Sequence, residues 1–234
     1  MTAGGRTLLR RVDMHTHTEF SPDSRTKLAA FAAAAADAGL DAVCVTDHDT
    51  VEGALRLREI AAAVRVIVGE EISTKDGEII GLFLEAAVPR ALPAEETIAR
   101  IHDQGGIVYV PHPFSRNRRN HIRFSALQRI AGTLDAMEVF NAREAFAGDN
   151  RRALAFAARH AIAGGAGSDA HRSSELGRAY VELDRDFATP TEFVTALRSG
   201  RVAGRLSGVT VHVGTRYDVI RKWLRRRRRP AEGR

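Results

Sequence analysis

The 234 residues, 44% of them hydrophobic, can bury one large core, so we expect one domain over residues 1–215 and a basic helix or tail over residues 216–234. The net charge of +6 does not indicate a nucleic-acid-binding body, because nine Lys or Arg and two Asp or Glu between Arg216 and Arg234 leave residues 1–215 at −1. A single cysteine excludes a disulfide framework, and no apolar run approaches a membrane span, so we expect a cytoplasmic protein without membrane contact.

Short apolar, β-branched segments alternate with alanine- and leucine-rich segments of helical spacing, which predicts α/β units around a mainly parallel sheet. The expected strands cover residues 8–14, 42–46, 64–69, 78–84, 106–110, 136–140 and 161–166. The expected helices cover residues 27–38, 51–63, 94–104, 149–160 and 191–199. Cys44 lies in the second strand, where it is expected to be a small core residue.

Histidines and acidic residues recur where the expected strands end. In chain order they are His15 and His17, Asp47 to Asp49, Glu70 and Glu71, His112 between two prolines, Glu138 and Asn141, and Asp169 and His171. Because the carboxyl ends of the strands in a closed parallel barrel surround one mouth, we expect these side chains to converge there.

The residue types in these pairs point to metal binding. Residues i and i+2 of an extended segment face the same way, so His15 and His17 can chelate one ion, and Asp169 can face the same cavity as His171. Neither pair is specific alone, but a set of buried charges needs compensation by ions or partners. Histidines and carboxylates without thiolates favour two or three ions of Zn, Mn or Fe, with metal-bound water as the nucleophile and Glu71 as a candidate bridge.

Six segments carry a resemblance to a known family. They are Asp13–His17, Ser21–Ser24, Val45–Thr50, Gly69–Ser73, Pro111–Pro113 and Gly167–His171. In this order they resemble the motifs of the PHP (polymerase and histidinol phosphatase) superfamily, over a match from Val12 to about Arg205. The resemblance implies a distorted (β/α)7 TIM-like barrel, a trinuclear metal site and phosphoesterase activity.

The resemblance also implies which residues bind each ion. The ligands would be His15, His17, Glu71 and Asp169 for the first ion, Asp23, His48 and His171 for the second, and Glu71 with His112 for the third. Glu71 is preferred to Glu70 because the family's glutamate directly precedes Ile or Val and then Ser. The segment Glu138–Arg143 lacks the histidine that many relatives supply for the third ion, and Asn141 is a weak substitute, so the third ion is expected to be loose or absent.

Several charged residues around these motifs have supporting or open roles. Asp47 and Asp49 are expected to orient imidazoles and to cap the next helix. The arginines that follow site strands either hold the substrate's phosphate or form an ordinary solvated loop. They are Arg116, Arg118, Arg119 and Arg143. His121 is as consistent with the surface as with the third ion, and His102, His160 and His212 receive no role.

The leading hypothesis is a phosphatase or nuclease. Its substrate would be a small phosphomonoester, a nucleotide or the end of an RNA or DNA chain. Short relatives that share Thr46–Thr50 and Glu71–Ser73 include nucleotide phosphatases and 5′-to-3′ exonucleases, which favours a nucleotide-type substrate. The alternatives are a barrel amidohydrolase acting on an amide or lactone, and a non-enzymatic scaffold that binds metal and holds nucleic acid with its basic tail. The nearly complete ligand set speaks against the scaffold.

Deleting Arg225–Arg229 tests the basic tail, which is either a solvated terminus or an arm that attracts nucleic acid. We expect turnover of a small phosphoester to stay unchanged, because all six motifs precede these residues. If the tail is an arm that attracts RNA, its deletion should weaken RNA binding, and that binding should depend strongly on salt, because arginines neutralise phosphates. RNA-binding titrations at several salt concentrations measure both effects, and an unchanged RNA affinity would make the tail a solvated terminus.

Overall fold

The computed structural model describes residues 10–207, so His212 and the expected tail over residues 216–234 lie outside the described part of the chain. The strands are β1 (Arg10–Thr16), β2 (Ala42–Val45), β3 (Arg65–Thr74), β4 (Gly77–Leu82), β5 (Ile107–Val110), β6 (Ala136–Asn141), β7 (Ala163–Gly167), β8 (Ala179–Leu183) and β9 (Arg201–Gly204). The α-helices are α1 (Leu28–Asp37), α2 (Glu52–Ile60), α3 (Ala94–His102), α4 (Phe124–Ile130), α5 (Ala147–Arg159) and α6 (Pro190–Ser199). None of these helices is long and apolar enough to cross a membrane.

The strands form one curved sheet that nearly closes into a barrel. Its strand order is β7-β6-β5-β4-β3-β2-β1-β8-β9. The first seven strands close into a ring because Thr16 forms a β-bridge with Ala170 just beyond β7. The amide of Asp169 also donates to the carbonyl of His15 at 2.7 Å. The strands β8 and β9 continue outward from the amino-terminal half of β1. The expected fold class, a distorted TIM-like barrel, is confirmed.

The strands β1 to β7 occur where the sequence predicts them, but the sheet is mixed. The strand β4 is antiparallel to both β3 and β5, because a tight turn at Thr74–Gly77 returns the chain directly alongside β3. Gly77 has φ +123 in this turn, and an added Cβ would lie 2.4 Å from the Cα of Ile122. The carboxyl-terminal pair β8 and β9 and the short helix α4 were not expected from the sequence.

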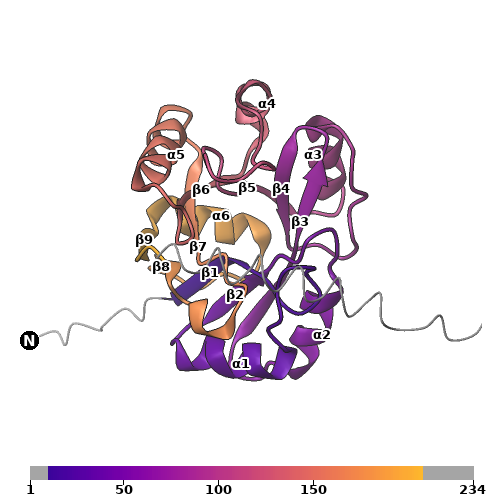
Figure 1. Ribbon diagram of the computed structural model, residues 1–234, viewed down its shortest axis with the longest axis vertical. Helices are drawn as coiled ribbons and strands as arrows, with labels where there is room; N and C mark the ends of the chain where they lie inside the picture. Colours follow the sequence, from indigo (N-terminus) through magenta and orange to yellow (C-terminus); the bar gives the residue numbers. More distant parts are fainter. Residues whose placement is uncertain (1–9, 208–234) are drawn as a thin grey trace, which may run out of the picture.

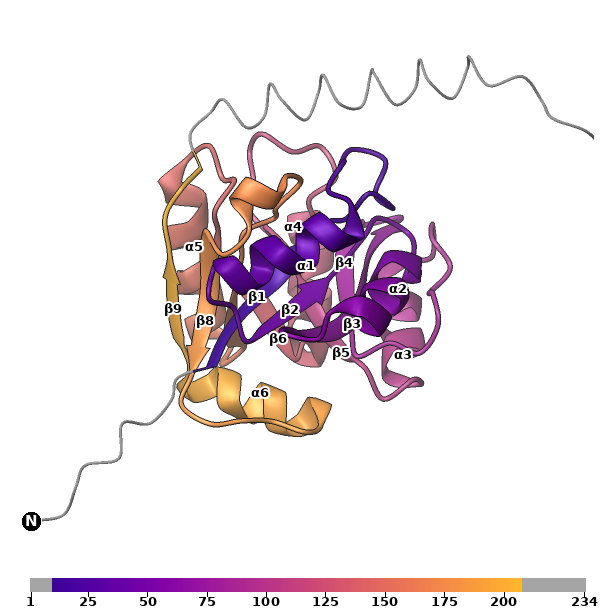
Figure 2. The ribbon, with the colours of Figure 1, turned by 90° about the horizontal axis from the view of Figure 1, so that it is seen from below.

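The helices surround the barrel unevenly (Figures 1 and 2). The helices α1 and α2 lie side by side below the sheet in Figure 1, and α3 flanks β4. Figure 2 shows α6 beneath the strands, at the end of the barrel opposite the loops that follow β5 and β7. Thr189 and Glu192 form a capping box at the start of α6 and Pro190 occupies its first turn, in keeping with the helix expected there.

The barrel interior is a packed core that α6 seals from below. Side chains from β1, β2, β4 and β5 join those of α6 in one buried cluster, in which Phe193 is fully buried and stacks edge-on against Phe83 at 5.4 Å between ring centroids. A second cluster lies between the strands and the outer helices. Cys44 is buried in the interior cluster, as predicted. The polar side chains at the mouth therefore lie above a closely packed apolar core.

Replacing Gly165 with alanine tests this close packing. The new Cβ would lie 2.6 Å from the Tyr109 ring and 2.8 Å from the sulfur of Met14, both fully buried. We expect Gly165→Ala to lower the free energy of unfolding by about 1–3 kcal/mol, the usual cost of overpacking a core. Gly132→Ala is the matched control, because nothing lies within 4 Å of its added Cβ. Urea unfolding measures both, and equal stability of the two variants would contradict the packing described.

Candidate metal centre

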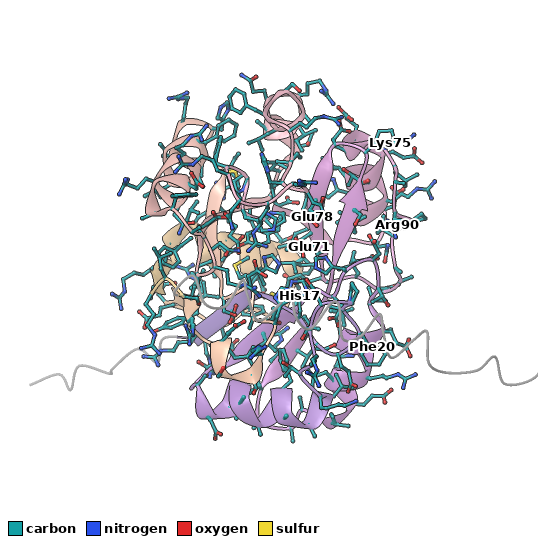
Figure 3. All side chains as sticks on the ribbon, in the orientation of Figure 1. His17, Phe20, Glu71, Lys75, Glu78 and Arg90 are labelled. Atoms are coloured by element: carbon teal, nitrogen blue, oxygen red, sulfur yellow. The ribbon has the colours of Figure 1, made fainter. Side chains whose placement is uncertain are left out.

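The structure brings all eight expected metal ligands together at the mouth of the barrel. They are His15, His17, Asp23, His48, Glu71, His112, Asp169 and His171. His17, Glu71 and Glu78 lie near one another at the centre of Figure 3, between α5 and the hairpin of β3 and β4. Five of the eight are at most 2% exposed, whereas the side chains of Asp23 and His48 are 20% and 21% exposed and lie on the side toward solvent. The strand ends therefore converge as the sequence predicts.

His15 and His17 share one group with two carboxylates. Their Nε2 atoms are 3.1 Å apart, and both face Glu71 Oε2, at 3.2 Å from His15 and 3.4 Å from His17. Asp169 Oδ1 completes the group at 3.9 Å from His15 Nε2 and 3.6 Å from His17 Nε2. Burial, and then the neighbouring His171, lower the pKa of His17 to about 3, so its imidazole is neutral and can present a lone pair to an ion.

His48 and His171 form a second group around Asp23. Asp23 Oδ2 lies 2.8 Å from His171 Nε2 and 3.6 Å from His48 Nε2. The ring of His17 stacks beside both imidazoles, with centroids 4.6 Å from His48 and 4.3 Å from His171. Burial opposes protonation of His48, but Glu71 and Asp23 outweigh it and raise the pKa of His48 to about 10. In the absence of an ion, this side chain thus carries a proton that compensates the carboxylates.

Glu71 connects the two groups to His112. Its Oε2 also lies 3.2 Å from His48 Nδ1, whereas its Oε1 lies 3.0 Å from His112 Nε2. Glu70, the next residue back on β3, points the opposite way and accepts from the amide of Val88. Alternation along the strand therefore places Glu71, and not Glu70, in the centre.

The donor set fits divalent metal ions. Two nitrogens bound to one tetrahedral Zn²⁺ at about 2.0–2.1 Å stand about 3.3 Å apart, close to the separation of the His15 and His17 Nε2 atoms. Asp169 Oδ1 is buried without a hydrogen-bond partner, and it faces both imidazoles. The described part of the chain holds four overlapping groups of three histidine, Asp or Glu side chains, and within each group the ligand atoms lie within 4.8 Å of one another. A buried carboxylate oxygen without a donor is costly unless a cation meets it.

Hydrogen bonds fix which imidazole nitrogen faces the centre. Ser21 Oγ donates to Asp47 Oδ1 at 2.7 Å and can accept from His17 Nδ1 at 3.0 Å, which leaves the Nε2 lone pair of His17 toward the centre. Glu138 Oε1 likewise accepts from His15 Nδ1 at 3.3 Å, which leaves the Nε2 lone pair of His15 toward the centre. Asp47 thus acts on His17 through Ser21.

The helix cap expected of Asp49 is wrong. The helix α2 begins after Val51 without a side-chain cap, and Asp49 Oδ2 instead lies 3.3 Å from Arg90 Nη1. The backbone of Asp49 has φ 54, which turns the carboxylate toward β3, where it accepts from the amide of Ser73 at 2.7 Å and from its hydroxyl at 3.1 Å. Asp49 therefore braces β3 two residues beyond Glu71.

Three residues at the strand ends adopt left-handed backbone conformations. They are Asp49 with φ 54, His112 with φ 28 and Asp169 with φ 53. Asp and His tolerate this region better than most residues, although it remains unfavourable for any side chain with a Cβ. The turn at Asp169 lets its amide bond to His15 while its carboxylate points into the centre.

The four arginines considered for substrate binding lie in different places. Arg118 Nη2 contacts Asp169 Oδ2 and its side chain is 21% exposed at the centre. Arg143 is buried and donates to the carbonyl of Asp169 at 3.3 Å. Arg116 instead pairs with Asp149 at 2.9 Å and lies over the ring of Phe146. Arg119 is exposed on the same loop. Of the four arginines, Arg118 and Arg143 therefore contact a residue of the centre, Asp169.

Asn141 does not replace the missing histidine. Its Nδ2 donates to Glu138 at 2.9 Å and to Asp169 Oδ2 at 3.1 Å, and its Oδ1 accepts from the amide of Arg143 at 2.8 Å. Both the nitrogen and the oxygen of the Asn141 side-chain amide are therefore bonded to protein groups. His121 bonds to the carbonyl of Arg118 and belongs to none of the four clusters of metal-binding atoms. His102 pairs with Asp135 on the surface, and His160 stacks on Phe156.

Glu78 is a member of the centre that sequence reasoning missed. It is 5% exposed, and its carboxylate groups with His48 and Glu71. Burial, and then the proximity of Glu71, raise the pKa of Glu78 to about 8. The strand-end pattern could not find it, because Glu78 lies near the start of β4, and only an antiparallel strand brings that end to the mouth. A tight turn signal at Thr74–Gly77, just after the glutamate motif, was the one available indication.

Comparison with known families and proteins gives one consistent result. The family model described as PHP domain matches residues 13–144, and a model described as PHP-associated matches residues 147–202. Two uncharacterized proteins of Methanocaldococcus jannaschii are similar to the chain. One is 38% identical over 141 residues, which cover 56% of this chain and 60% of that protein. The other is 37% identical over 145 residues, which cover 56% of this chain and 82% of that protein.

A solved structure from Bacteroides vulgatus has the same fold. It is the crystal structure of a two-domain protein containing a predicted PHP-like metal-dependent phosphoesterase, with a TM-score of 0.68 and 17% sequence identity. The match covers 84% of this chain and 65% of that chain. The chain therefore spans less than two thirds of the length of this protein and of the first Methanocaldococcus protein.

Replacing His48 or Asp169 with alanine should lower the amount of bound divalent metal. Each substitution removes a side chain that faces the shared cluster of imidazoles and carboxylates, so the remaining donors hold an ion less tightly. Elemental analysis after equilibrium dialysis measures the metal content. His102→Ala is the matched control, because this histidine pairs with Asp135 on the surface. A metal content equal to that of the control would remove the substituted residue from the centre.

Proposed function

Because this chain belongs to the PHP domain family, we propose that it is a metal-dependent phosphoesterase that acts on a nucleotide-type phosphomonoester or a phosphorylated nucleic-acid end. The observation that carries the proposal is the position of Glu71, whose two oxygens face different imidazole groups at 3.0–3.4 Å. A carboxylate shared in this way suits a site with more than one divalent ion. Such sites suit phosphate esters, which present several anionic oxygens to the ions.

The chain's own residues would prepare the centre for this chemistry. His15 and His17 are held with their Nε2 atoms inward by Glu138 and by the Ser21–Asp47 pair. Divalent ions bound between these donors would acidify a coordinated water and neutralise charge that develops on the phosphate oxygens. The packed interior beneath the centre excludes water from the other side. Substrate would thus approach from the mouth.

Arg118 and Arg143 have different parts in this proposal. Arg118 is partly exposed beside Asp169, so it can meet an anionic substrate oxygen from the solvent side. Burial opposes ionisation of Asp169, but Arg118 and His15 hold the pKa of its carboxyl well below the usual range, so the carboxylate is charged and available. Arg143 is buried and holds the backbone of Asp169, which makes it a positioning residue.

The substrate class is the finer part of the proposal. The centre supplies a place for a phosphate, but nothing in the barrel core selects the group attached to it. Arg119 is exposed on the loop that carries Arg118, and it offers positive charge to a further phosphate. This arrangement supports a substrate with more than one phosphate, such as a bisphosphonucleotide or a nucleic-acid chain.

A panel of phosphate esters tests the activity. We expect Mn²⁺-loaded protein to release phosphate or nucleotide from at least one of p-nitrophenyl phosphate, adenosine 3′,5′-bisphosphate and a 5′-phosphorylated RNA oligonucleotide. Chelation of the metal, and separately His48→Ala or Asp169→Ala, should reduce turnover to background, because each removes part of the proposed machinery. Phosphate release and product chromatography measure these outcomes, with His102→Ala as the folded control.

Two results would contradict the proposal in distinct ways. Metal-replete protein that releases no phosphate from any of the three esters, but hydrolyses an amide or lactone, would favour a barrel amidohydrolase. Metal-replete protein with no turnover of either kind would favour a binding scaffold. Turnover that survives both chelation and the two substitutions would show that the activity arises elsewhere.

A further inference from the structure

An exposed aromatic side chain lies beside the mouth of the barrel. Phe146 is 48% exposed and belongs to the segment between β6 and α5. It follows Arg143 by three residues, and Arg143 donates to the backbone of Asp169 in the metal centre. The helix α5, which begins directly after Phe146, lies at one side of the mouth (Figure 1). The ring of Phe146 is therefore placed at the rim by a segment that is anchored to the centre.

The ring of Phe146 has a guanidinium over one face. The Cζ atom of Arg116 lies 4.3 Å from the ring centroid, which is a cation–π contact. Asp149, which is 2% exposed, holds this guanidinium, since it accepts from Arg116 Nε at 2.9 Å and from the Arg116 amide at 3.1 Å. Because one face of the ring is covered and Phe146 is still 48% exposed, its open area belongs to the opposite face and the ring edge.

Exposure alone assigns no role to Phe146, because single exposed apolar side chains are common on protein surfaces. Phe124 is the other aromatic side chain of similar exposure in residues 10–207, at 54%. Its ring packs against Phe114 and Phe156, with centroids 6.1 Å and 6.3 Å away. Packing within an aromatic cluster therefore explains Phe124. The ring contact of Phe146, in contrast, is with an arginine beside the mouth.

Positive charge lies beside Phe146. A Cβ added to Gly148 would lie 3.7 Å from Arg151 Nη2 and 3.9 Å from Arg116 Nη2, so two guanidinium groups approach each other there. A buried carboxylate neutralises one of them, and the exposed Arg151 can meet a phosphate. Arg118 reaches the centre and is two residues from Arg116, so at most about 7 Å of backbone separates the two. A phosphate in the centre and a group on Phe146 can thus belong to one ligand.

We propose that Phe146, backed by Arg116, is a stacking platform for a nucleobase of the substrate. Every base presents a π-face, so an exposed aromatic ring with a neighbouring guanidinium holds nucleotides without selecting one base. The base would lie on the open face of Phe146 while the phosphate lies in the metal centre. The inference rests on the proposed function, because a nucleotide-type substrate supplies the base. A phosphomonoester without a base gains nothing from the platform.

Two ligands that differ only in the base test the platform. They are the phosphonate analogues of adenosine 5′-phosphate and of ribose 5-phosphate, in which carbon replaces the ester oxygen so that binding is measured without turnover. We expect the Mn²⁺-loaded wild-type chain to bind the adenosine analogue about 5–100-fold more tightly, as base stacking on an aromatic ring requires. Phe146→Leu keeps an apolar side chain without the ring and should remove most of this difference, whereas Phe146→Tyr should restore it. Isothermal titration calorimetry measures each affinity.

An RNA ligand distinguishes the two sources of the base. It is a tetranucleotide with the same 5′-phosphonate, prepared with and without its first base. A base preference that depends on Phe146 in the adenosine analogue alone would assign the platform to free nucleotides. The same dependence in the RNA would extend the platform to the ends of nucleic-acid chains.

Phe124→Leu is the matched control. Its ring is as exposed as that of Phe146, but it packs on Phe114 and Phe156. We expect this variant to keep the base preference of the wild-type chain for both ligands. The platform would be overturned by a wild-type chain without base preference for either ligand. It would also be overturned by equal base preferences in Phe146→Leu and Phe124→Leu.

Failure of this inference differs from failure of the proposed function. A base preference that Phe146→Leu removes, in a chain whose wild type releases no phosphate from any ester, would support the platform and contradict the phosphoesterase. Phosphate release from a nucleotide by the wild type, with the same KM in Phe146→Leu and no base preference in binding, would support the phosphoesterase and overturn the platform.

Discussion

The carboxylate of Glu71 is the constraint around which the mouth of this barrel is arranged. A buried carboxylate tolerates its position only when positive or donating groups meet both oxygens. Here one oxygen faces His15, His17 and His48, and the other faces His112. The imidazoles come from three different strand ends, so the charge of one residue on β3 ties β1, β2 and β5 to a common point.

The closed sheet makes this convergence possible and the core beneath it makes it rigid. Each strand end is held by its neighbours, and the contact of β7 with β1 completes the ring through the backbone of Asp169 and His15. The glycines of β7 leave room for Tyr109 and Met14 in the interior. His15 and Glu71 lie within strands and most of the other donors follow a strand by a few residues, whereas Asp23 lies in the loop between β1 and α1. Short distances from the strands suit a centre whose donor atoms must be held precisely.

Much of the molecule could be predicted from the sequence because its signals are local. Seven strands and the convergence of seven of the eight ligands follow from apolar runs that end near His, Asp or Glu, whereas Asp23 was indicated only by the resemblance to the PHP motifs. Glu78 escaped prediction because hairpin direction depends on how a turn packs, and a strand-end pattern assumes parallel neighbours. The cap expected of Asp49 failed for a related reason, since a left-handed backbone redirected its side chain to β3. Sequence patterns locate elements better than they orient single side chains.

The left-handed residues at the strand ends have a consequence for how this protein tolerates change. Such a conformation costs about 1–3 kcal/mol at each position and persists only when its surroundings over-determine it. Glycine at His112 or Asp169 would relieve that cost in the backbone. The same substitutions would also remove two side chains that face the centre. Relief of the backbone and retention of the candidate metal ligands are therefore opposed at these two positions, and stabilising changes are better sought on the outer helices.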